Sequence, residues 1–218
     1  MKKGYLFSLI SFVAVISSCS KDPIISTADE VGTSKVTYYP SITVNGDRIM
    51  AVAQGGAFTD AGAKATAGSA DITVDVSGTV NTAVADTYTI TYTATNQDGF
   101  SVTDYRTVVV YATDPDAAAH DLSGSYLRAA TGELAIWTKI APGVYIIQNP
   151  GGAAAGEDLF VAAINHSDFT ISIPTQHATD GTVSSSSDEV YTDANPAKYE
   201  WKFLNPNYGT QLRTFEKQ

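Results

Sequence analysis

The chain has 218 residues, of which 44% are hydrophobic and 17% are charged. This composition is too apolar for a disordered chain and suffices for one large domain or two small ones. Lysine and arginine number 13 against 23 aspartate and glutamate residues, and the net charge of -10 disfavours nucleic acid or an anionic lipid surface held by charge. A single cysteine excludes a disulfide framework and a multi-cysteine zinc site.

Residues 1–18 have the pattern of a signal peptide. Lys2 and Lys3 precede an apolar stretch of 12 residues from Tyr5 to Ile16. A membrane-spanning helix needs about 20 apolar residues, so this stretch is too short to span a bilayer. We therefore expect it to direct export and to be removed.

The end of this segment, Ile16-Ser17-Ser18-Cys19, resembles the bacterial lipobox. The resemblance implies that Cys19 carries lipid and becomes the first residue of a mature chain anchored in the outer membrane. The alternative is an ordinary signal peptide followed by an incidental cysteine. Ser20-Lys21-Asp22 is similar to the export tag of Bacteroidetes surface lipoproteins, which implies display at the cell surface. Pro23 departs from that tag, since a second acidic residue is usual there.

Residues 19–34 are small and polar and predict a lipidated tether. The twelve residues 23–34, as flexible chain, have a root-mean-square reach of about 20 Å, which would lift a domain off the lipid headgroups.

Residues 35–112 predict a β-sandwich. From Thr87 to Thr95 the sequence alternates strictly: Tyr88, Ile90, Tyr92 and Ala94 fall on one face and five threonines on the other. A turn follows, and residues 100–111 return as the hairpin partner with valines facing the tyrosine side. About seven short strands separated by turn residues are typical of a sandwich.

This region also resembles the bacterial immunoglobulin-like domain found in surface proteins and in some insecticidal crystal toxins. The resemblance covers roughly residues 38–112 and rests on these segments in order: Pro40-Ser41-Ile42-Thr43-Val44-Asn45-Gly46, Gly56-Ala57-Phe58-Thr59-Asp60-Ala61-Gly62-Ala63, Asp71-Ile72-Thr73, Tyr88-Thr89-Ile90-Thr91-Tyr92-Thr93-Ala94 and Arg106-Thr107-Val108. Ala70 and Asp86 stand where the family usually has glycine. The resemblance implies an immunoglobulin-like fold that serves as a spacer or adhesive stalk.

Residues 113–121 contain a proline and no alternating pattern, and predict a linker. Residues 122–218 again show short strands between turns, too close together for crossover helices. We expect an antiparallel meander sheet or half-barrel, with a long serine-rich loop over residues 182–195. Its strands are expected at 125–128, 134–139, 144–148, 159–165, 169–173, 199–204 and 211–215. Short segments around Tyr126, Tyr145 and Gly151 are similar to the C-terminal β domain of uncharacterised Bacteroidetes lipoproteins, which implies no activity.

Both tryptophans and half of the phenylalanines lie in this C-terminal part. Tyr199, Trp201 and Phe203 share a strand face and are expected to line a core. Leu134 and Ile136 offer an inward pair, which would turn Trp137 to solvent, and Tyr145 would join it. An exposed Trp137–Tyr145 pair is the predicted ligand site, because flat aromatic side chains stack on sugar rings.

No nucleophile elbow, phosphate loop, dinucleotide motif or His-Glu-x-x-His motif occurs in the sequence. We therefore expect no enzyme, no cofactor and no metal site, with the aspartates capping turns rather than binding calcium. A hydrolase using two of Glu133, Glu157, Asp158, Glu189 and Glu200 is the least favoured alternative.

The sequence thus predicts a non-enzymatic, all-β surface lipoprotein whose partners are the membrane, through its lipid, and either a glycan or another surface protein. In the first alternative the C-terminal domain is a recognition module of a nutrient-uptake system. In the second the chain is a structural or adhesive subunit that binds protein through exposed sheet edges.

Overall fold

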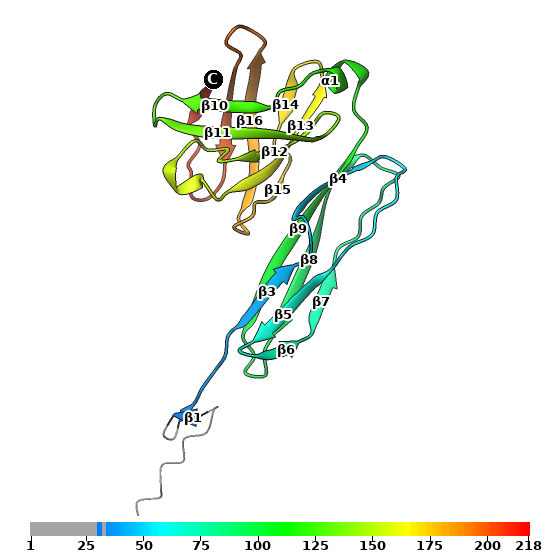
Figure 1. Cartoon of the computed structure of the whole chain (residues 1–218), viewed down its shortest axis with the longest axis vertical. Helices are drawn as coiled ribbons and strands as arrows, with labels where there is room; N and C mark the ends of the chain where they lie inside the picture. The colour runs from blue at the N-terminus through cyan, green and yellow to red at the C-terminus, as the bar shows by residue number, and fades with distance from the viewer. Residues whose placement is uncertain (1–29, 32–33) are drawn as a thin grey trace, which may run out of the picture. The chain divides into compact units, whose positions relative to one another are not determined.

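The computed structural model describes residues 30–31 and 34–218, so the predicted signal peptide, Cys19 and most of the tether lie outside the described residues. The chain divides into two compact units, Met1–Thr37 and Tyr38–Gln218. In the first unit β1 (Glu30–Val31) pairs with β2 (Ser34–Lys35). In the second, two β-sheet domains follow one another along the chain (Figure 1).

Seven strands form the first domain as two facing sheets. One sheet has the order β3-β5-β6 and the other the order β4-β9-β8-β7. The strands are β3 (Pro40–Val44), β4 (Ile49–Ala53), β5 (Ala63–Ala67), β6 (Ala70–Ile72), β7 (Val74–Ser77), β8 (Asp86–Thr95) and β9 (Ser101–Tyr111). The expected sandwich is confirmed, and β4 joins it parallel to β9.

The β8–β9 hairpin supplies much of the sandwich core. Tyr92 and Ala94 are fully buried on the predicted inward face of β8, and Ile90 is nearly so. Val108 of β9 pairs with Tyr88 and packs in the same cluster. The alternating sequence therefore marks the inward face correctly, because successive side chains of a strand point to opposite sides.

One charged side chain is buried in this sandwich. The Arg106 side chain is fully buried and forms an ion pair with Asp60, while its Nε donates to the Asp47 carbonyl at 3.0 Å. The Tyr92 hydroxyl donates to the same Asp60 carboxylate at 2.6 Å, and burial followed by this contact raises the pKa of Tyr92 well above its ordinary value. Arg106 thereby joins two loops to the hairpin.

A one-turn helix, α1 (Pro115–Ala119), lies in the predicted linker. None of the described helices is long enough and apolar enough to cross a bilayer. The two domains contact each other through strand residues outside this linker. Ile49 and Val109 of the sandwich form a buried cluster with Val144 and Ala162 of the second domain.

The second domain is one antiparallel sheet with the order β14-β13-β12-β11-β10-β18-β17-β16-β15. Its strands are β10 (Gly124–Arg128), β11 (Glu133–Ala141), β12 (Val144–Gln148), β13 (Phe160–Ser167), β14 (Thr170–Ser172), β15 (Gln176–His177), β16 (Val183–Thr192), β17 (Lys198–Leu204) and β18 (Leu212–Lys217), with a short 3-10 turn at Ala154–Gly156. The sheet curls until its two ends meet, where the Ser186 amide donates to the Ile173 carbonyl at 3.0 Å. The predicted half-barrel is confirmed.

The predicted loop over residues 182–195 is wrong for most of its length. Residues 183–192 form β16, which pairs with β17 in two stretches separated by a bulge between Ser187 and Val190. Asp188 in the bulge has a positive φ of 56°. The serine content hid this strand, because its register depends on a partner strand and not on its own hydrophobic pattern.

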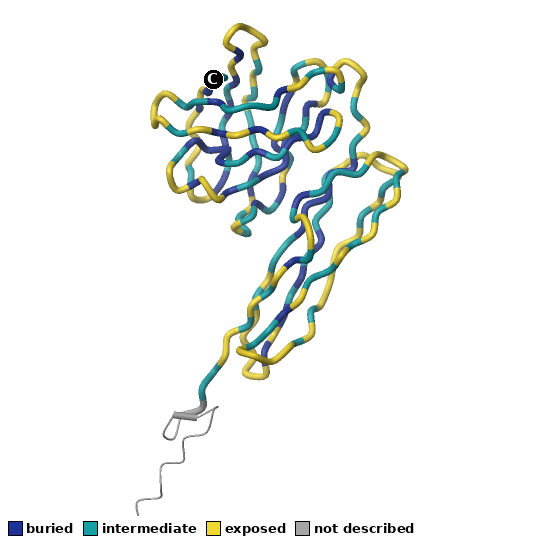
Figure 2. Tube along the Cα trace, in the orientation of Figure 1, coloured by how far each residue is buried: buried dark blue, intermediate teal, exposed yellow. Residues whose placement is uncertain are grey.

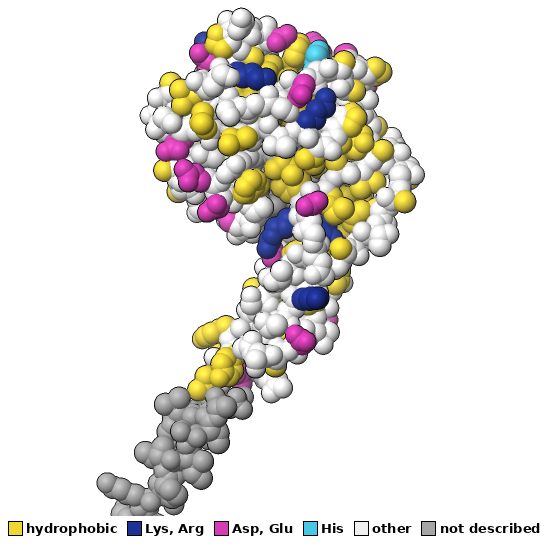
Figure 3. Space-filling model, viewed as in Figure 1, with side chains coloured by type: hydrophobic (Ala, Val, Ile, Leu, Met, Phe, Trp, Pro, Cys, Tyr) yellow, Lys and Arg dark blue, Asp and Glu magenta, His cyan; other side chains and the backbone are white. Residues whose placement is uncertain are grey.

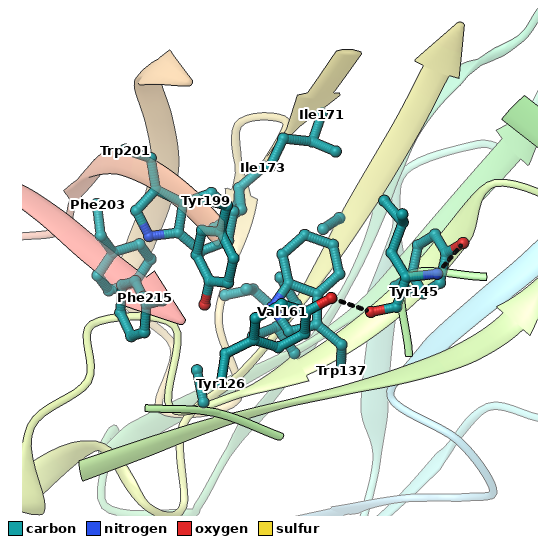
Figure 4. Packing of buried hydrophobic residues seen from close by; sticks show 14 of the residues in the cluster. Tyr126, Trp137, Tyr145, Val161, Ile171, Ile173, Tyr199, Trp201, Phe203 and Phe215 are labelled. Atoms are coloured by element: carbon teal, nitrogen blue, oxygen red, sulfur yellow. Dashed lines mark hydrogen bonds between the residues drawn. The ribbon is translucent and has the colours of Figure 1, made fainter. Parts of the chain in front are cut away.

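Aromatic side chains fill the half-barrel (Figure 4), and buried positions recur along its strands (Figure 2). Tyr199, Trp201 and Phe203 of β17 are fully buried, as expected from their shared face. The Trp201 indole nitrogen donates to the Pro150 carbonyl at 3.1 Å. Such rings contribute large buried apolar areas, and Trp and Tyr usually find a partner for their polar atoms.

Candidate functional site

The predicted exposed pair Trp137–Tyr145 lies in the core, and this prediction is wrong. The relative exposures are 2% for Trp137 and 0% for Tyr145, and the two rings contact each other edge to face with centroids 5.6 Å apart. Leu134 and Ile136 point outward instead, with exposures of 41% and 38%. The prediction failed because both faces of β11 carry apolar residues, so the sequence does not show which face is buried. In the structure the face with the aromatic side chain of Trp137 points into the interior.

The outward face of β11 carries Leu134, Ile136 and Ile140 in a row, all exposed. Hydrophobic side chains gather over one face of this domain in the space-filling view (Figure 3). A hollow of about 340 Å³ beside this row contains Glu133, Glu157 and Asp158, three of the five carboxylates considered for a hydrolase. Among the described residues no group of three or more His, Cys, Asp or Glu side chains could hold a metal ion.

A larger hollow, of about 400 Å³, opens at the end of the half-barrel next to α1. We call it the mouth hollow. It is bounded by the chain after α1, by the turn before β14, by the β16–β17 connection and by the end of β18. Its lining residues are His120, Asp121, Leu122, Phe169, Tyr191, Asp193, Ala194, Asn195, Pro196, Ala197, Lys217 and Gln218.

Three stacked rings form one wall of the mouth hollow. His120 stacks on Phe169 with centroids 4.1 Å apart, and Phe169 stacks on Tyr191 with centroids 5.4 Å apart. Phe169 thus stacks on both of its neighbours, and all three residues line the hollow. The Tyr191 hydroxyl reaches inward to within 3.2 Å of the Tyr126 hydroxyl.

The wall is held by hydrogen bonds to the chain around His120. The His120 carbonyl accepts from Lys139 Nζ at 2.7 Å and from the Tyr145 hydroxyl at 3.2 Å. The His120 Nδ1 atom lies 3.0 Å from the Asp168 carbonyl. His120 falls in the predicted linker of residues 113–121, and in the structure it is a half-buried part of this wall.

Charged and amide side chains stand around the rings. Asp121 has a lowered pKa, first because Ser123 donates to its carboxylate and second because Lys139 and Lys217 lie near. Lys217 Nζ lies 5.7 Å from the centre of the Tyr126 ring, within cation–π range. Asp193 and Asn195 are exposed in the connection between β16 and β17. The hollow therefore offers donors, acceptors and apolar ring surface together.

Sequence reasoning missed most of the mouth hollow. Its residues come from separate segments between positions 120 and 218, and four of them fall in the stretch predicted as a loop: Tyr191, Asp193, Ala194 and Asn195. The alternation of Val190 with Tyr191 and Thr192 is the signal that could have marked a strand there. Nothing local could have shown that these segments meet at one end of the sheet.

Residues 42–110 match the family model of the bacterial surface protein, Ig-like domain. The sandwich has an immunoglobulin-like fold. This match, together with the sheet order described above, confirms the predicted fold of the first domain and places it with domains of bacterial surface proteins. The match covers about a third of the chain and leaves the half-barrel unassigned.

No curated protein matches the chain. Among solved structures, the crystal structure of a lipoprotein from Bacteroides thetaiotaomicron is similar, with 22% sequence identity and a TM-score of 0.41, over 83% of this chain and 100% of that chain. At this level of similarity the comparison supports no functional inference, and the mouth hollow has to be interpreted from its own side chains.

Proposed function

We propose that this chain is a lipid-anchored, non-enzymatic protein of the bacterial cell surface. In this proposal the Ig-like domain acts as a spacer, and the half-barrel binds a carbohydrate in the mouth hollow. The surface assignment draws on the Ig-like family match, and the anchor draws on the lipobox resemblance at Cys19.

The mouth hollow is the observation that carries the carbohydrate proposal. A sugar ring presents hydroxyl groups around its edge and C–H groups on its faces, so it is bound best by polar side chains next to aromatic ones. The hollow has this combination, with Asp121, Asp193 and Asn195 beside the rings of His120 and Tyr191. Its volume of about 400 Å³ falls within the range of small-molecule sites.

The charges favour a ligand without strong negative charge. Two carboxylates and one lysine line the hollow, and the whole chain carries a net charge of -10. An anionic ligand would meet repulsion from Asp121 and Asp193, while a neutral sugar can donate hydroxyl hydrogens to both. This separates the proposal from phosphate or nucleotide binding.

A glycan array tests the proposal, using a soluble protein of residues 20–218 that keeps every described residue and omits Cys19. We expect binding to at least one neutral glycan, weakened by Asp193→Ala. The matched control is Asp158→Ala, which removes an exposed aspartate from the hollow of about 340 Å³ beside β11. A blank array contradicts carbohydrate binding. If the Asp158 variant loses binding and the Asp193 variant does not, the sugar binds in the hollow beside β11 and not in the mouth hollow.

The anchor has a separate test. Cells expressing the full chain are labelled with radioactive palmitate, and the Cys19→Ser variant is the control. We expect label in the wild-type protein alone, and protease treatment of intact cells should degrade it if it faces outward. Absence of label from the wild-type protein contradicts the lipid anchor.

A further inference from the structure

We infer that the end of the Ig-like domain nearest to Cys19 along the chain docks on the headgroup region of the lipid bilayer. The contact is made by three exposed aromatic side chains, Tyr38, Tyr39 and Phe100, which we call the aromatic end. This inference rests on the lipid anchor of the proposed function and is independent of carbohydrate binding. It gives the Ig-like domain a fixed orientation on the membrane in addition to its role as a spacer.

Exposed aromatic side chains are confined to this end. Among the described residues, the Phe, Tyr and Trp side chains are buried or half-buried except those of Tyr39, Tyr38 and Phe100, with exposures of 68%, 44% and 44%. The rings of Tyr39 and Phe100 contact each other edge to face, with centroids 4.9 Å apart. Apolar ring surface left in water is unfavourable, and exposed rings that gather at one place are typical of a surface that meets a partner.

Three segments that are distant in sequence meet at the aromatic end. Tyr38 and Tyr39 precede β3, and Phe100 ends the turn between β8 and β9. The ring of Tyr38 lies over Gly68 in the turn between β5 and β6, where an added Cβ atom would come within 2.8 Å of Tyr38 Cδ1. Figure 1 shows both turns at the end of the sandwich where β3 begins. The exposed rings therefore surround one end of the domain.

Asn96 holds the aromatic end in a fixed shape. Its Nδ2 donates to the Tyr38 carbonyl at 2.8 Å, and its Oδ1 accepts from the amides of Asp98 and Phe100 at 3.0 and 2.8 Å. The Asn96 side chain is itself buried. The rings are thus carried by backbone that is ordered before any contact forms, so docking does not have to pay for ordering it.

The position of the aromatic end along the chain identifies the bilayer as its partner. Residues 20–37 separate Cys19 from Tyr38, and a chain of this length spans at most about 65 Å when fully extended. A lipid on Cys19 therefore confines the aromatic end to the neighbourhood of the bilayer surface. Because the contact is then intramolecular, the effective concentration is high and a weak contact suffices.

The chemistry of the aromatic end fits neutral or zwitterionic headgroups. Tyrosine places an apolar ring against lipid and its hydroxyl in water, and it is enriched at membrane interfaces for this reason. Residues 38–41, 67–71 and 96–101 include two aspartates and neither lysine nor arginine, so attraction to anionic lipid does not contribute. A second copy of the chain is a poorer partner, because two chains of net charge -10 repel each other.

Docking fixes the direction of the sandwich. The strand β9 begins at Ser101, next to Phe100, and ends at Tyr111, from which the chain continues toward the half-barrel. Its 11 residues cover about 35 Å. Contact at the aromatic end therefore keeps the exit toward the half-barrel away from the lipid.

The single cysteine allows the anchor to be reproduced chemically. A protein of residues 19–218 is coupled through Cys19 to a maleimide lipid in phosphatidylcholine vesicles. The vesicles contain brominated phosphatidylcholine, which quenches the fluorescence of a tryptophan that enters the bilayer. The result does not depend on lipidation in the cell, because the maleimide lipid supplies the anchor.

Two single-tryptophan additions act as reporters. Tyr39→Trp places one at the aromatic end. Val84→Trp is the matched control, since Val84 is also exposed but precedes β8, whereas Phe100 follows that strand at its other end. The native Trp137 and Trp201 are buried in the half-barrel and give a constant background.

We expect brominated lipid to quench the Tyr39→Trp reporter and to leave the Val84→Trp reporter unquenched. Adding Phe100→Ser to the Tyr39→Trp protein should reduce the quenching by half or more, because it removes the neighbouring ring. Adding anionic phosphatidylglycerol to the vesicles should not increase the quenching, since the aromatic end has no cationic side chain to attract it.

Other outcomes overturn the inference. An unquenched Tyr39→Trp reporter shows that the domain stays off the lipid, and equal quenching of both reporters shows that neither end is preferred. If the uncoupled protein sediments as a dimer that Tyr39→Ser with Phe100→Ser abolishes, a second copy covers the aromatic end instead. These failures leave the lipid anchor intact, whereas a failed palmitate test of Cys19 removes the anchor whatever the reporters show.

Discussion

The ring of Phe169 lies parallel to that of Tyr191, with 7° between their planes and 5.4 Å between their centres. Phe169 belongs to the turn before β14 and Tyr191 to β16, so this contact joins the two parts of the curled sheet at the mouth. The same contact forms one wall of the mouth hollow. The pair therefore contributes to the candidate site and, together with the hydrogen bond from the Ser186 amide to the Ile173 carbonyl, to the closure of the half-barrel.

Phe169→Ala should affect both the stability of the half-barrel and carbohydrate binding. Removing a half-buried ring should lower the free energy of unfolding by about 2 kcal/mol, and removing the wall should also weaken carbohydrate binding. Phe160→Ala is the control, since Phe160 is another half-buried phenylalanine but packs on the outer face. Urea unfolding and the glycan array measure both quantities. If the two variants lose affinity equally, the loss comes from general destabilisation and not from the wall.

Trp137→Ala should damage the core. Replacing a buried aromatic side chain by alanine costs about 3–5 kcal/mol, and the midpoint of urea unfolding followed by the fluorescence of Trp201 should fall accordingly. Leu134→Ala on the outer face of the same strand should change stability by less than about 1 kcal/mol. A stable Trp137→Ala variant would argue that the indole is exposed after all.

Arg106→Met should destabilise the Ig-like domain by about 3 kcal/mol, because it leaves the Asp60 carboxylate without its buried partner. Adding Asp60→Asn should recover part of the loss. Circular dichroism reports on both domains, whereas tryptophan fluorescence reports on the half-barrel, which contains both tryptophans. Unfolding of the Ig-like domain should therefore shift to lower urea in circular dichroism without a matching shift in fluorescence. A change confined to the fluorescence transition would contradict this assignment.

Alkaline pH should unfold the half-barrel cooperatively. Burial raises the pKa values of Tyr126, Tyr145, Tyr191 and Tyr199. Because these folded pKa values exceed those of the unfolded chain, the neutral phenols contribute stability that is fully present below about pH 10 and is lost as pH rises further. Phenolate absorbance should therefore appear in two steps, the second together with the loss of tryptophan fluorescence. A single step before unfolding would show that the phenols are accessible.

The sequence predicted most of the fold because the alternation of apolar and polar residues within a strand is visible in a short stretch of sequence. The alternation from Thr87 to Thr95 marks a strand and its inward face, and short gaps between strands exclude crossover helices. The Ig-like segments could likewise be found in order along the chain. The β16 strand escaped, since its serines and the bulge at Asp188 carry no such periodic signal.

The tertiary structure alone decided which side of β11 faces inward and where the site lies. A strand apolar on both faces gives no preference, and only the width of the interior made Trp137 a core residue and Leu134 a surface one. The mouth hollow joins residues nearly 100 positions apart, from His120 to Lys217. Such proximity follows from the curl of the sheet and from long-range strand pairing, which local side-chain pattern does not record.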